Sequence, residues 1–216
     1  NLGDAGRRLN PGYLRGWLMA PWAVEAGTTM PDVLSTSPLA KRGDVLGDLV
    51  HFLVSKNGPF VVDEADAIDA ARAARGETLF HTVGCVACHA QGRSPTARVG
   101  GDDAFSEAVV TFDPIRLQSV PLPDFRAKTN FESLSAFLYE PHVVRPSGRM
   151  PDMKLSPEEA GDLASYLLSD IRGATAATHS GDAFAVDARK AARGAEAFVS
   201  LRCVACHDDG EQEFPA

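Results

Sequence analysis

Apolar residues recur at helical spacing in the stretch DAIDAARAARGETLFH, residues 66–81. Ile68, Ala71, Leu79 and Phe80 follow one another at intervals that predict a helix leading into Cys85. Gly76 inside this helix lowers helix stability. We therefore expect another element to approach the helix backbone closely at Gly76.

A second helix is predicted after Leu155. Ser156 is a suitable N-cap, Pro157 suits the first helical position, and Glu159 completes a capping box. An apolar stripe then follows at helical spacing, which indicates that one face of the helix is buried. The stripe consists of Leu163, Tyr166, Leu167 and Ile171.

A third helix is predicted at 130–139, where Asn130 can cap the stretch NFESLSAFLY. Residues 90–124 are rich in Gly, Pro and polar side chains, which predicts a loop that wraps around another group. No stretch has the strong alternation of a strand, so the predicted fold class is all-α. No apolar run approaches the roughly 18 residues of a membrane span.

The composition is that of a soluble globular protein, with 216 residues of which 44% are hydrophobic and 23% charged. This length suits one large domain or two small ones. We expect a soluble chain that is a processed product or a piece of a longer one. The net charge of −8 disfavours nucleic acid as a partner and favours a basic partner surface.

All four cysteines lie in two copies of one pentapeptide, Cys85-Val-Ala-Cys88-His89 and Cys203-Val-Ala-Cys206-His207. Cys-x-x-Cys-His is the sequence at which haem is attached through two thioether bonds, with the histidine placed to bind iron. Two Cys-x-x-Cys units could instead form a four-cysteine zinc site or dithiol redox pairs. Neither alternative needs the histidine, so the motifs predict two covalently attached haem c groups.

The repetition extends beyond the two pentapeptides. RGETLFHTVGCVACH (75–89) aligns with RGAEAFVSLRCVACH (193–207), and GDLVHFLVS (47–55) aligns with GDLASYLLS (161–169). WLMAPWAVEAGTTMPD (17–32) aligns without a gap with FLYEPHVVRPSGRMPD (137–152). The chain is thus predicted to alternate methionine-bearing and cysteine-bearing halves, beginning with a methionine-bearing one.

Residues 66–172 resemble a complete class I cytochrome c. The resemblance rests on Gly76 and Phe80 in the first helix, the Cys85–His89 motif, Met150 followed by proline, and Tyr166 in the last helix. It implies a cytochrome c-like domain whose helices and loops wrap the haem, with the first helix packed against the last. It also implies that His89 is the proximal iron ligand and Met150 the distal one. The segment is similar to cytochrome modules of multi-domain bacterial proteins.

Two other residues near Met150 could be the distal ligand. Met153 lacks the following proline, and His142 corresponds in the repeat to Trp22, which cannot bind iron. A thioether is a soft, uncharged ligand that favours ferrous iron. An iron with both axial positions filled is suited to passing single electrons and not to binding a substrate.

Two half-domains remain at the ends of the chain, a methionine-side half at 1–56 and a Cys-x-x-Cys-His half at 184–216. Joined end to beginning, they give a second cytochrome in permuted order, with Met30 as the ligand opposite His207. Three arrangements are open: completion within the same chain, exchange of halves between identical chains, or a longer polypeptide with further cytochrome domains.

The sequence predicts electron transfer by a dihaem c-type cytochrome with His/Met ligation, a carrier more than an enzyme. The alternatives are a dihaem cytochrome c peroxidase-like enzyme and a cytochrome module of a larger dehydrogenase complex. Haem attachment of this kind occurs outside the cytoplasm, so the resemblance implies a periplasmic or other extracytoplasmic location. The expected partners are redox proteins, with no nucleic acid.

Overall fold

In the computed structural model, the described residues form helices joined by turns and loops, with no strand among them. None of the helices in those residues is both long enough and apolar enough to cross a membrane. The described residues are 2–25, 28–35, 38–62, 69–89, 120, 122–146, 148–169 and 184–207. The elements are α1 (Ala5–Arg8), α2 (Pro11–Met19), α3 (Pro21–Val24), α4 (Leu39–Ser55), α5 (Ala70–Thr82), the 3-10 turn η2 (Cys85–Ala87), α6 (Phe125–Lys128), α7 (Phe131–Tyr139), α8 (Pro141–Val144), α9 (Pro157–Leu168), α10 (Ala188–Ser200) and the 3-10 turn η3 (Cys203–Ala205).

Side-chain caps fix where the three predicted helices begin. The Ser156–Glu159 capping box at the start of α9 is present, and the Asn130 side chain accepts a hydrogen bond from Ser133 N–H at the start of α7. α5 begins at Ala70, behind an Asp69 cap, and so starts later than the predicted stretch at 66–81. Residues 63–68 lie outside the described residues, as does most of the loop predicted at 90–124.

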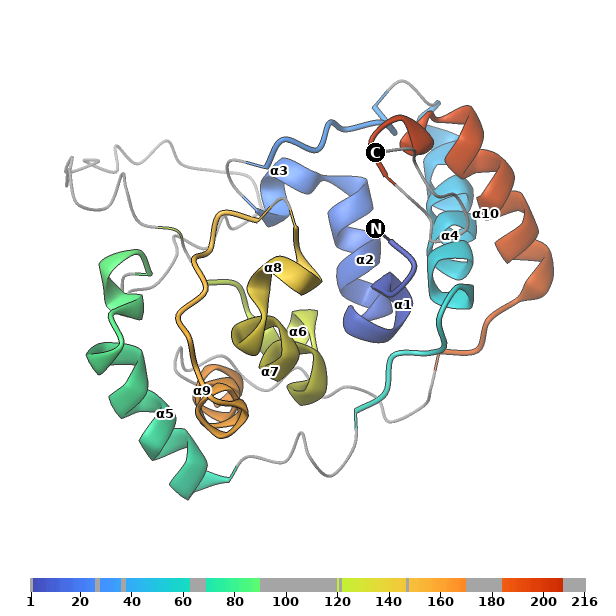
Figure 1. Ribbon diagram of the computed structural model, residues 1–216. Coiled ribbons are helices and arrows are strands. Elements are labelled where there is room, and N and C mark those ends of the chain that lie inside the picture. The colour runs from blue at the N-terminus through green and yellow to red at the C-terminus, as the bar shows by residue number, and fades with distance from the viewer. Residues whose placement is uncertain are drawn as a thin grey trace, which may run out of the picture.

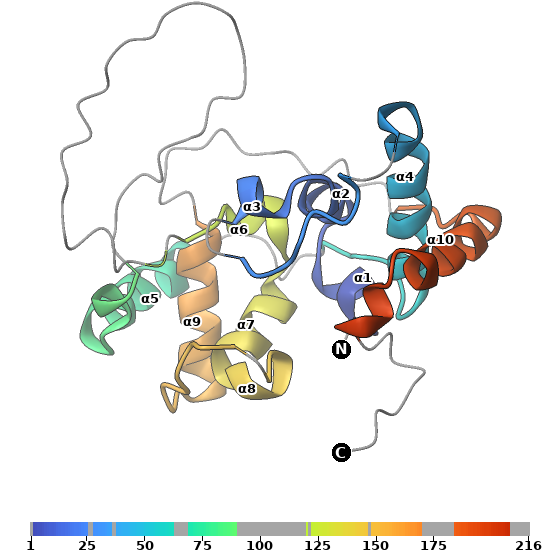
Figure 2. The same cartoon turned by 90° about the horizontal axis from the view of Figure 1, so that it is seen from above.

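Two clusters of buried apolar side chains form the cores of the molecule, and Figures 1 and 2 place them on opposite sides. We call them the central cluster, built mainly by α5, α7 and α9, and the terminal cluster, built mainly by α2, α4 and α10. The central cluster lies within a continuous part of the chain, whereas the terminal cluster joins its two ends. The central cluster includes Phe80, Leu134, Leu138, Leu163, Tyr166 and Leu167, and the terminal cluster Leu14, Leu18, Leu46, Leu49, Phe52 and Phe198.

In the central cluster, α5 crosses α9 in direct backbone contact. A Cβ atom on Gly76 would lie 2.0 Å from the carbonyl oxygen of Asp162, so only glycine fits at this point. The expected close approach at Gly76 is thereby confirmed. The rings of Phe80 and Tyr166 pack beside it, with centroids 5.6 Å apart. Arg75 donates two hydrogen bonds to the buried Asp162 carboxylate, at 2.7 and 2.8 Å.

In the terminal cluster, α10 crosses α4 with the same set of contacts. A Cβ atom on Gly194 would lie 2.1 Å from the carbonyl oxygen of Asp48. The rings of Phe52 and Phe198 lie 5.4 Å apart. Arg193 donates two hydrogen bonds of 2.7 Å each to the Asp48 carboxylate. Helices from opposite ends of the chain therefore pack as closely as α5 and α9 do.

Polar contacts join the two halves of the molecule where the turn between α1 and α2 meets the turn between α6 and α7. Asn10 N–H donates to the carbonyl oxygen of Lys128 at 2.9 Å, and the Thr129 hydroxyl donates to the carbonyl oxygen of Arg8 at 2.7 Å. The Lys128 ammonium lies 3.6 Å from the Glu25 carboxylate. These contacts hold the two clusters in a defined relative orientation.

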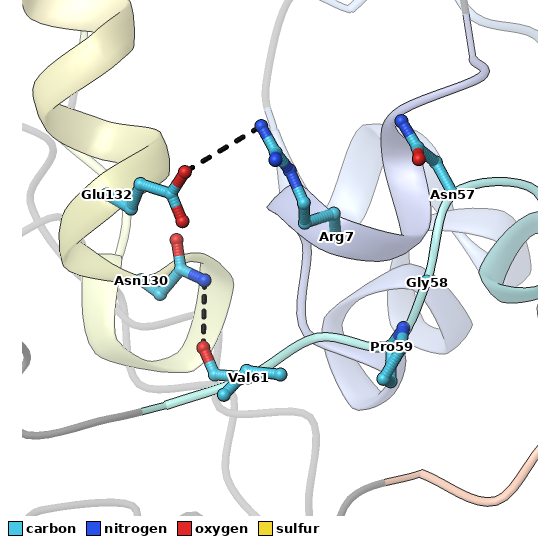
Figure 3. Close-up of a pocket in the computed structure, with 7 residues that line it drawn as sticks. All are labelled: Arg7, Asn57, Gly58, Pro59, Val61, Asn130 and Glu132. Carbon is cyan, nitrogen blue, oxygen red and sulfur yellow. Dashed lines mark hydrogen bonds and ion pairs between the residues drawn. The ribbon is translucent and has the colours of Figure 1, made fainter.

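A small pocket lies beside this junction, and Figure 3 shows the residues that line it. Asn130 donates a hydrogen bond of 2.9 Å to the carbonyl oxygen of Val61, and Arg7 faces Glu132 with a nitrogen–oxygen distance of 3.8 Å. Both residues of the ion pair are largely exposed, so the pair adds little to stability. The pocket belongs to the junction between the clusters.

Candidate functional site

The first Cys-x-x-Cys-His motif forms a tight turn at the end of α5. Gly84 has a φ of 97°, a left-handed conformation that ends the helical path, and η2 follows at Cys85. The carbonyl oxygen of Cys85 accepts hydrogen bonds from Cys88 N–H at 3.1 Å and from His89 N–H at 2.8 Å. The turn thus holds both thiols and the imidazole within one short stretch of backbone.

The imidazole of His89 is oriented by the carbonyl oxygen of Val120. Nδ1 lies 3.0 Å from this oxygen, and Val120 N–H donates to the carbonyl oxygen of Cys88 at 2.8 Å. Because a carbonyl only accepts, Nδ1 carries the proton and Nε2 keeps its lone pair for a metal. The sequence analysis did not single out Val120, since a backbone acceptor in a loop leaves no trace in side-chain chemistry.

None of the four cysteines of the two motifs forms a disulfide bond. Cys85 and Cys203 are half-buried and pack against the central and terminal clusters respectively, whereas Cys88 and Cys206 are exposed. Burial raises the pKa of the Cys85 thiol and of the Cys203 thiol. The two cysteine pairs contact different clusters, so they do not form the four-cysteine zinc site that was one alternative from the sequence. In the described ranges, no group of three or more His, Cys, Asp or Glu could hold a metal ion.

The second motif repeats the geometry of the first. Arg202 has a φ of 61°, η3 follows, and the carbonyl oxygen of Cys203 accepts from Cys206 N–H at 3.1 Å and from His207 N–H at 2.9 Å. Burial lowers the pKa of the His207 imidazole. The neutral form, which is the form that binds a metal, is therefore favoured at neutral pH.

Each predicted ligand methionine packs against the same cluster as one attachment cysteine. Met150 and Cys85 contact the central cluster, and Met30 and Cys203 contact the terminal cluster. Met30 lies near the start of the chain and Cys203 near its end, so the fold brings together residues that the sequence separates. Met153 also packs against the central cluster, whereas His142 is exposed on α8.

Trp17 is a site residue that the sequence analysis missed. Its indole N–H donates a hydrogen bond to the sulfur of Met30 at 2.9 Å, from α2. The aligned residue of the other copy is Phe137, which has no such donor. The available signal was the aligned pair of Trp17 and Phe137, of which only the indole has an N–H group that can donate.

The donor set of the first motif suits haem c. Such a haem requires two cysteine thiols that are not in a disulfide, an imidazole with Nε2 available and a methionine thioether. The turn provides the thiols and the imidazole, and the adjoining central cluster provides the thioether. The packing of α5 on α9 through Gly76, Phe80 and Tyr166 is the arrangement that the resemblance to class I cytochromes implied. Fold and donors together define a helical haem-attachment domain.

Comparison with known families supports this interpretation of the first motif. Residues 73–170 match the family model described as Cytochrome c, so this part of the chain is similar to a cytochrome c domain. The match supports covalently bound haem c and haem-based electron transfer, as predicted from the sequence. It covers one of the two Cys-x-x-Cys-His motifs. No curated protein and no solved structure matches the chain.

Proposed function

We propose that the chain is a dihaem c-type cytochrome that carries single electrons. His89 and Met150 bind the first iron, and His207 and Met30 bind the second. One observation supports the second centre above all: Met30 and Cys203 pack against the terminal cluster as Met150 and Cys85 pack against the central cluster. The donors of a second His/Met centre are therefore available within one chain.

In this proposal the halves at 1–56 and 184–216 together make a second cytochrome domain in permuted order. The contact of α10 with α4 through Gly194, which reproduces the contact of α5 with α9, supports completion within the same chain. Exchange of halves between identical chains would use the same contacts across two molecules. A longer polypeptide could add further cytochrome domains to this pair.

Electron carriage suits the proposed donors better than catalysis does. Haem c supplies a one-electron couple at its iron, and the protein tunes that couple through the axial ligands and their surroundings. The Val120 carbonyl fixes the tautomer of His89, and the Met150 and Met30 thioethers would be the sulfur ligands of the two irons. A peroxidase needs one iron with a vacant or displaceable position, which four filled positions do not provide.

The proposed partners and location follow from charge and attachment chemistry. With a net charge of −8, the chain would associate most readily with redox proteins that present a basic surface. Since haem attachment at Cys-x-x-Cys-His is made outside the cytoplasm, we place the protein in the periplasm or an equivalent compartment. Nucleic acid is not a proposed partner.

The four methionines of the chain provide the test. In the purified haem-loaded protein, Met150→Ala and Met30→Ala should each remove about half of the sulfur-to-iron charge-transfer absorption of the ferric state, because each deletes one of two thioether ligands. Met19→Ala and Met153→Ala are the matched controls and should leave it unchanged. Met19 is partly exposed, and Met153 is the rival ligand.

The outcomes separate the alternatives. Two thioether-bound haems in the intact protein, both unreactive toward peroxide, support the electron carrier. A single haem, or absorption that Met30→Ala leaves intact, would remove the second centre. Formation of a high-spin peroxide-reactive iron in the unmodified protein would favour the peroxidase-like enzyme.

A further inference from the structure

The two proposed thioether ligands differ in one hydrogen bond. The sulfur of Met30 accepts the indole N–H of Trp17 at 2.9 Å. The corresponding position of the other copy is Phe137, and among the residues that the structure describes no group donates to the sulfur of Met150. The centres are therefore inequivalent at the ligand atom itself.

Packing fixes the indole in place. Leu14 and Leu18 on α2 are buried in the terminal cluster, and Trp17 packs against the same cluster from the same helix. The ring also stacks on Tyr13 four residues earlier, with centroids 6.4 Å apart and planes inclined by 19°. Packing of the Trp17 ring therefore directs its N–H group toward the Met30 sulfur.

The contact is compatible with metal binding. A thioether sulfur has two lone pairs, so the N–H of Trp17 can use one and leave the other for a metal. The positive end of the N–H dipole withdraws electron density from the sulfur. The sulfur then stabilises the higher oxidation state of a bound iron less, which raises the reduction potential.

We propose that Trp17 is a positioning residue that raises the reduction potential of the centre ligated by Met30, through its hydrogen bond to the sulfur. The proposal rests on the proposed function, in which Met30 is an iron ligand. The two haems would then have different reduction potentials, and electrons would distribute unevenly between them. The difference would arise from one pair of aligned residues, Trp17 and Phe137.

The experiment is a redox titration of the haem-loaded full chain, followed by absorbance, for the wild type, Trp17→Phe and the reciprocal Phe137→Trp. Trp17→Phe should lower one of the two potentials and leave the other unchanged. The expected change is about fivefold in the ratio of reduced to oxidised haem at fixed potential, the effect of one modest hydrogen bond felt in one oxidation state. Phe137→Trp should raise the other potential.

A shape-conserving variant guards against loss of folding. Replacing Trp17 by benzothienylalanine keeps the bicyclic ring but substitutes sulfur for the N–H group. It should shift the potential in the same direction as Trp17→Phe, while the sulfur-to-iron absorption stays at full intensity. A purely structural role for Trp17 would leave the potential where it was in this isostere.

Two failures are distinguishable. If Met30→Ala leaves the charge-transfer absorption intact, Met30 is not a ligand and the proposed second centre fails. If Met30→Ala halves that absorption but neither Trp17 variant moves a potential, the tuning role of Trp17 is overturned and the dihaem assignment stands. Loss of the Met30 share of the absorption in the isostere would also overturn the tuning role.

Discussion

The central and terminal clusters contain the same helix crossing, but the two helices that cross differ in their order and separation along the chain. Arg75 and Asp162 are 87 residues apart, and Asp48 and Arg193 are 145 apart with the order of the two helices reversed. Loop-closure entropy rises slowly with length, so this extra separation costs less than about 0.6 kcal/mol. Burying a single leucine outweighs that cost. Packing thus depends on which residues meet far more than on their order in the chain.

The comparison also separates what both crossings require from what each can vary. Both have a glycine against a backbone carbonyl, a pair of aromatic rings and an arginine on a buried aspartate. Beside these, the surroundings diverge: Asp162 has a second arginine neighbour, Arg72, at 3.4 Å, and Met30 has Trp17. The shared residues build the fold, and the divergent ones adjust each half.

The largest effect is expected at the two glycines of the crossings. Gly76→Ala and Gly194→Ala should each lower the free energy of unfolding of their own half by about 3 kcal/mol, because the added Cβ would lie within 2.1 Å of a carbonyl oxygen and the helices must move apart. Thermal unfolding, followed by circular dichroism and by haem absorbance, measures both variants.

Gly43→Ala is the matched control on α4. No atom lies within 4 Å of a Cβ at Gly43, so alanine should raise helix stability by about 0.5–1 kcal/mol. Equal losses in the two crossing variants would mean that the terminal half is packed as firmly as the central one. If Gly194→Ala left the free energy of unfolding unchanged, α10 would not lie against α4, and the two crossings would not be equivalent.

A smaller effect is expected at the buried carboxylate of the central crossing. Asp162→Asn should lower the free energy of unfolding by about 2 kcal/mol at pH 7, since it weakens charge-assisted hydrogen bonds from two arginines. Glu77→Gln, on the exposed face of α5, is the control and should change stability by only a few tenths of a kcal/mol. Denaturant titration provides the measurement.

The pH dependence of the same variant gives an independent check. The hydrogen bond from Arg75 lowers the pKa of Asp162 in the folded protein. A lowered pKa contributes stability above the unfolded pKa of about 3.9 and loses it as the pH falls through the folded value. The difference between wild type and Asp162→Asn should therefore shrink below about pH 4. A difference that stays constant down to pH 2 would contradict the role of this charge.

The sequence predicted the central half in detail because its signals are local. The Ser156 capping box and the Asn130 cap depend on residues that are close in the chain. The close approach at position 76 was signalled by the glycine itself, which lacks a Cβ. The cysteine motifs are equally local. The domain boundaries at 56, 66, 172 and 184 stay predictions; those at 66 and 172 lie outside the described residues, and 184 borders such a segment.

What the sequence could not supply were contacts between distant residues. The alignment predicted that the terminal halves complete one another but left open whether α10 pairs with α4 of the same chain. The Val120 carbonyl beside His89 and the indole of Trp17 beside Met30 gave no signal, since the first involves the backbone and both join residues that are distant in the sequence. The copies align Met19 with Tyr139, and the structure leaves 39% of Met19 exposed at the end of α2. Alignment of the copies identifies such positions without fixing their orientation.

The smallest of the expected differences concerns the residue just before each attachment turn. Gly84 and Arg202 both have positive φ, at 97° and 61°. A residue with a Cβ in this region is strained by roughly 1–2 kcal/mol, which glycine avoids. The terminal half therefore holds its cysteine turn with strain that the central half lacks.

Exchanging the residue types at these turns should give unequal effects. Gly84→Ala should lower the free energy of unfolding by about 1 kcal/mol, since it introduces left-handed strain. Arg202→Gly should raise it by no more than a few tenths, because relief of strain is offset by the greater freedom of glycine in the unfolded chain. Thermal unfolding of both variants measures the pair. If Arg202→Gly destabilised the protein as much as Gly84→Ala, the Arg202 side chain would have to hold the second cysteine turn through contacts of its own, and the two turns would differ in more than backbone strain.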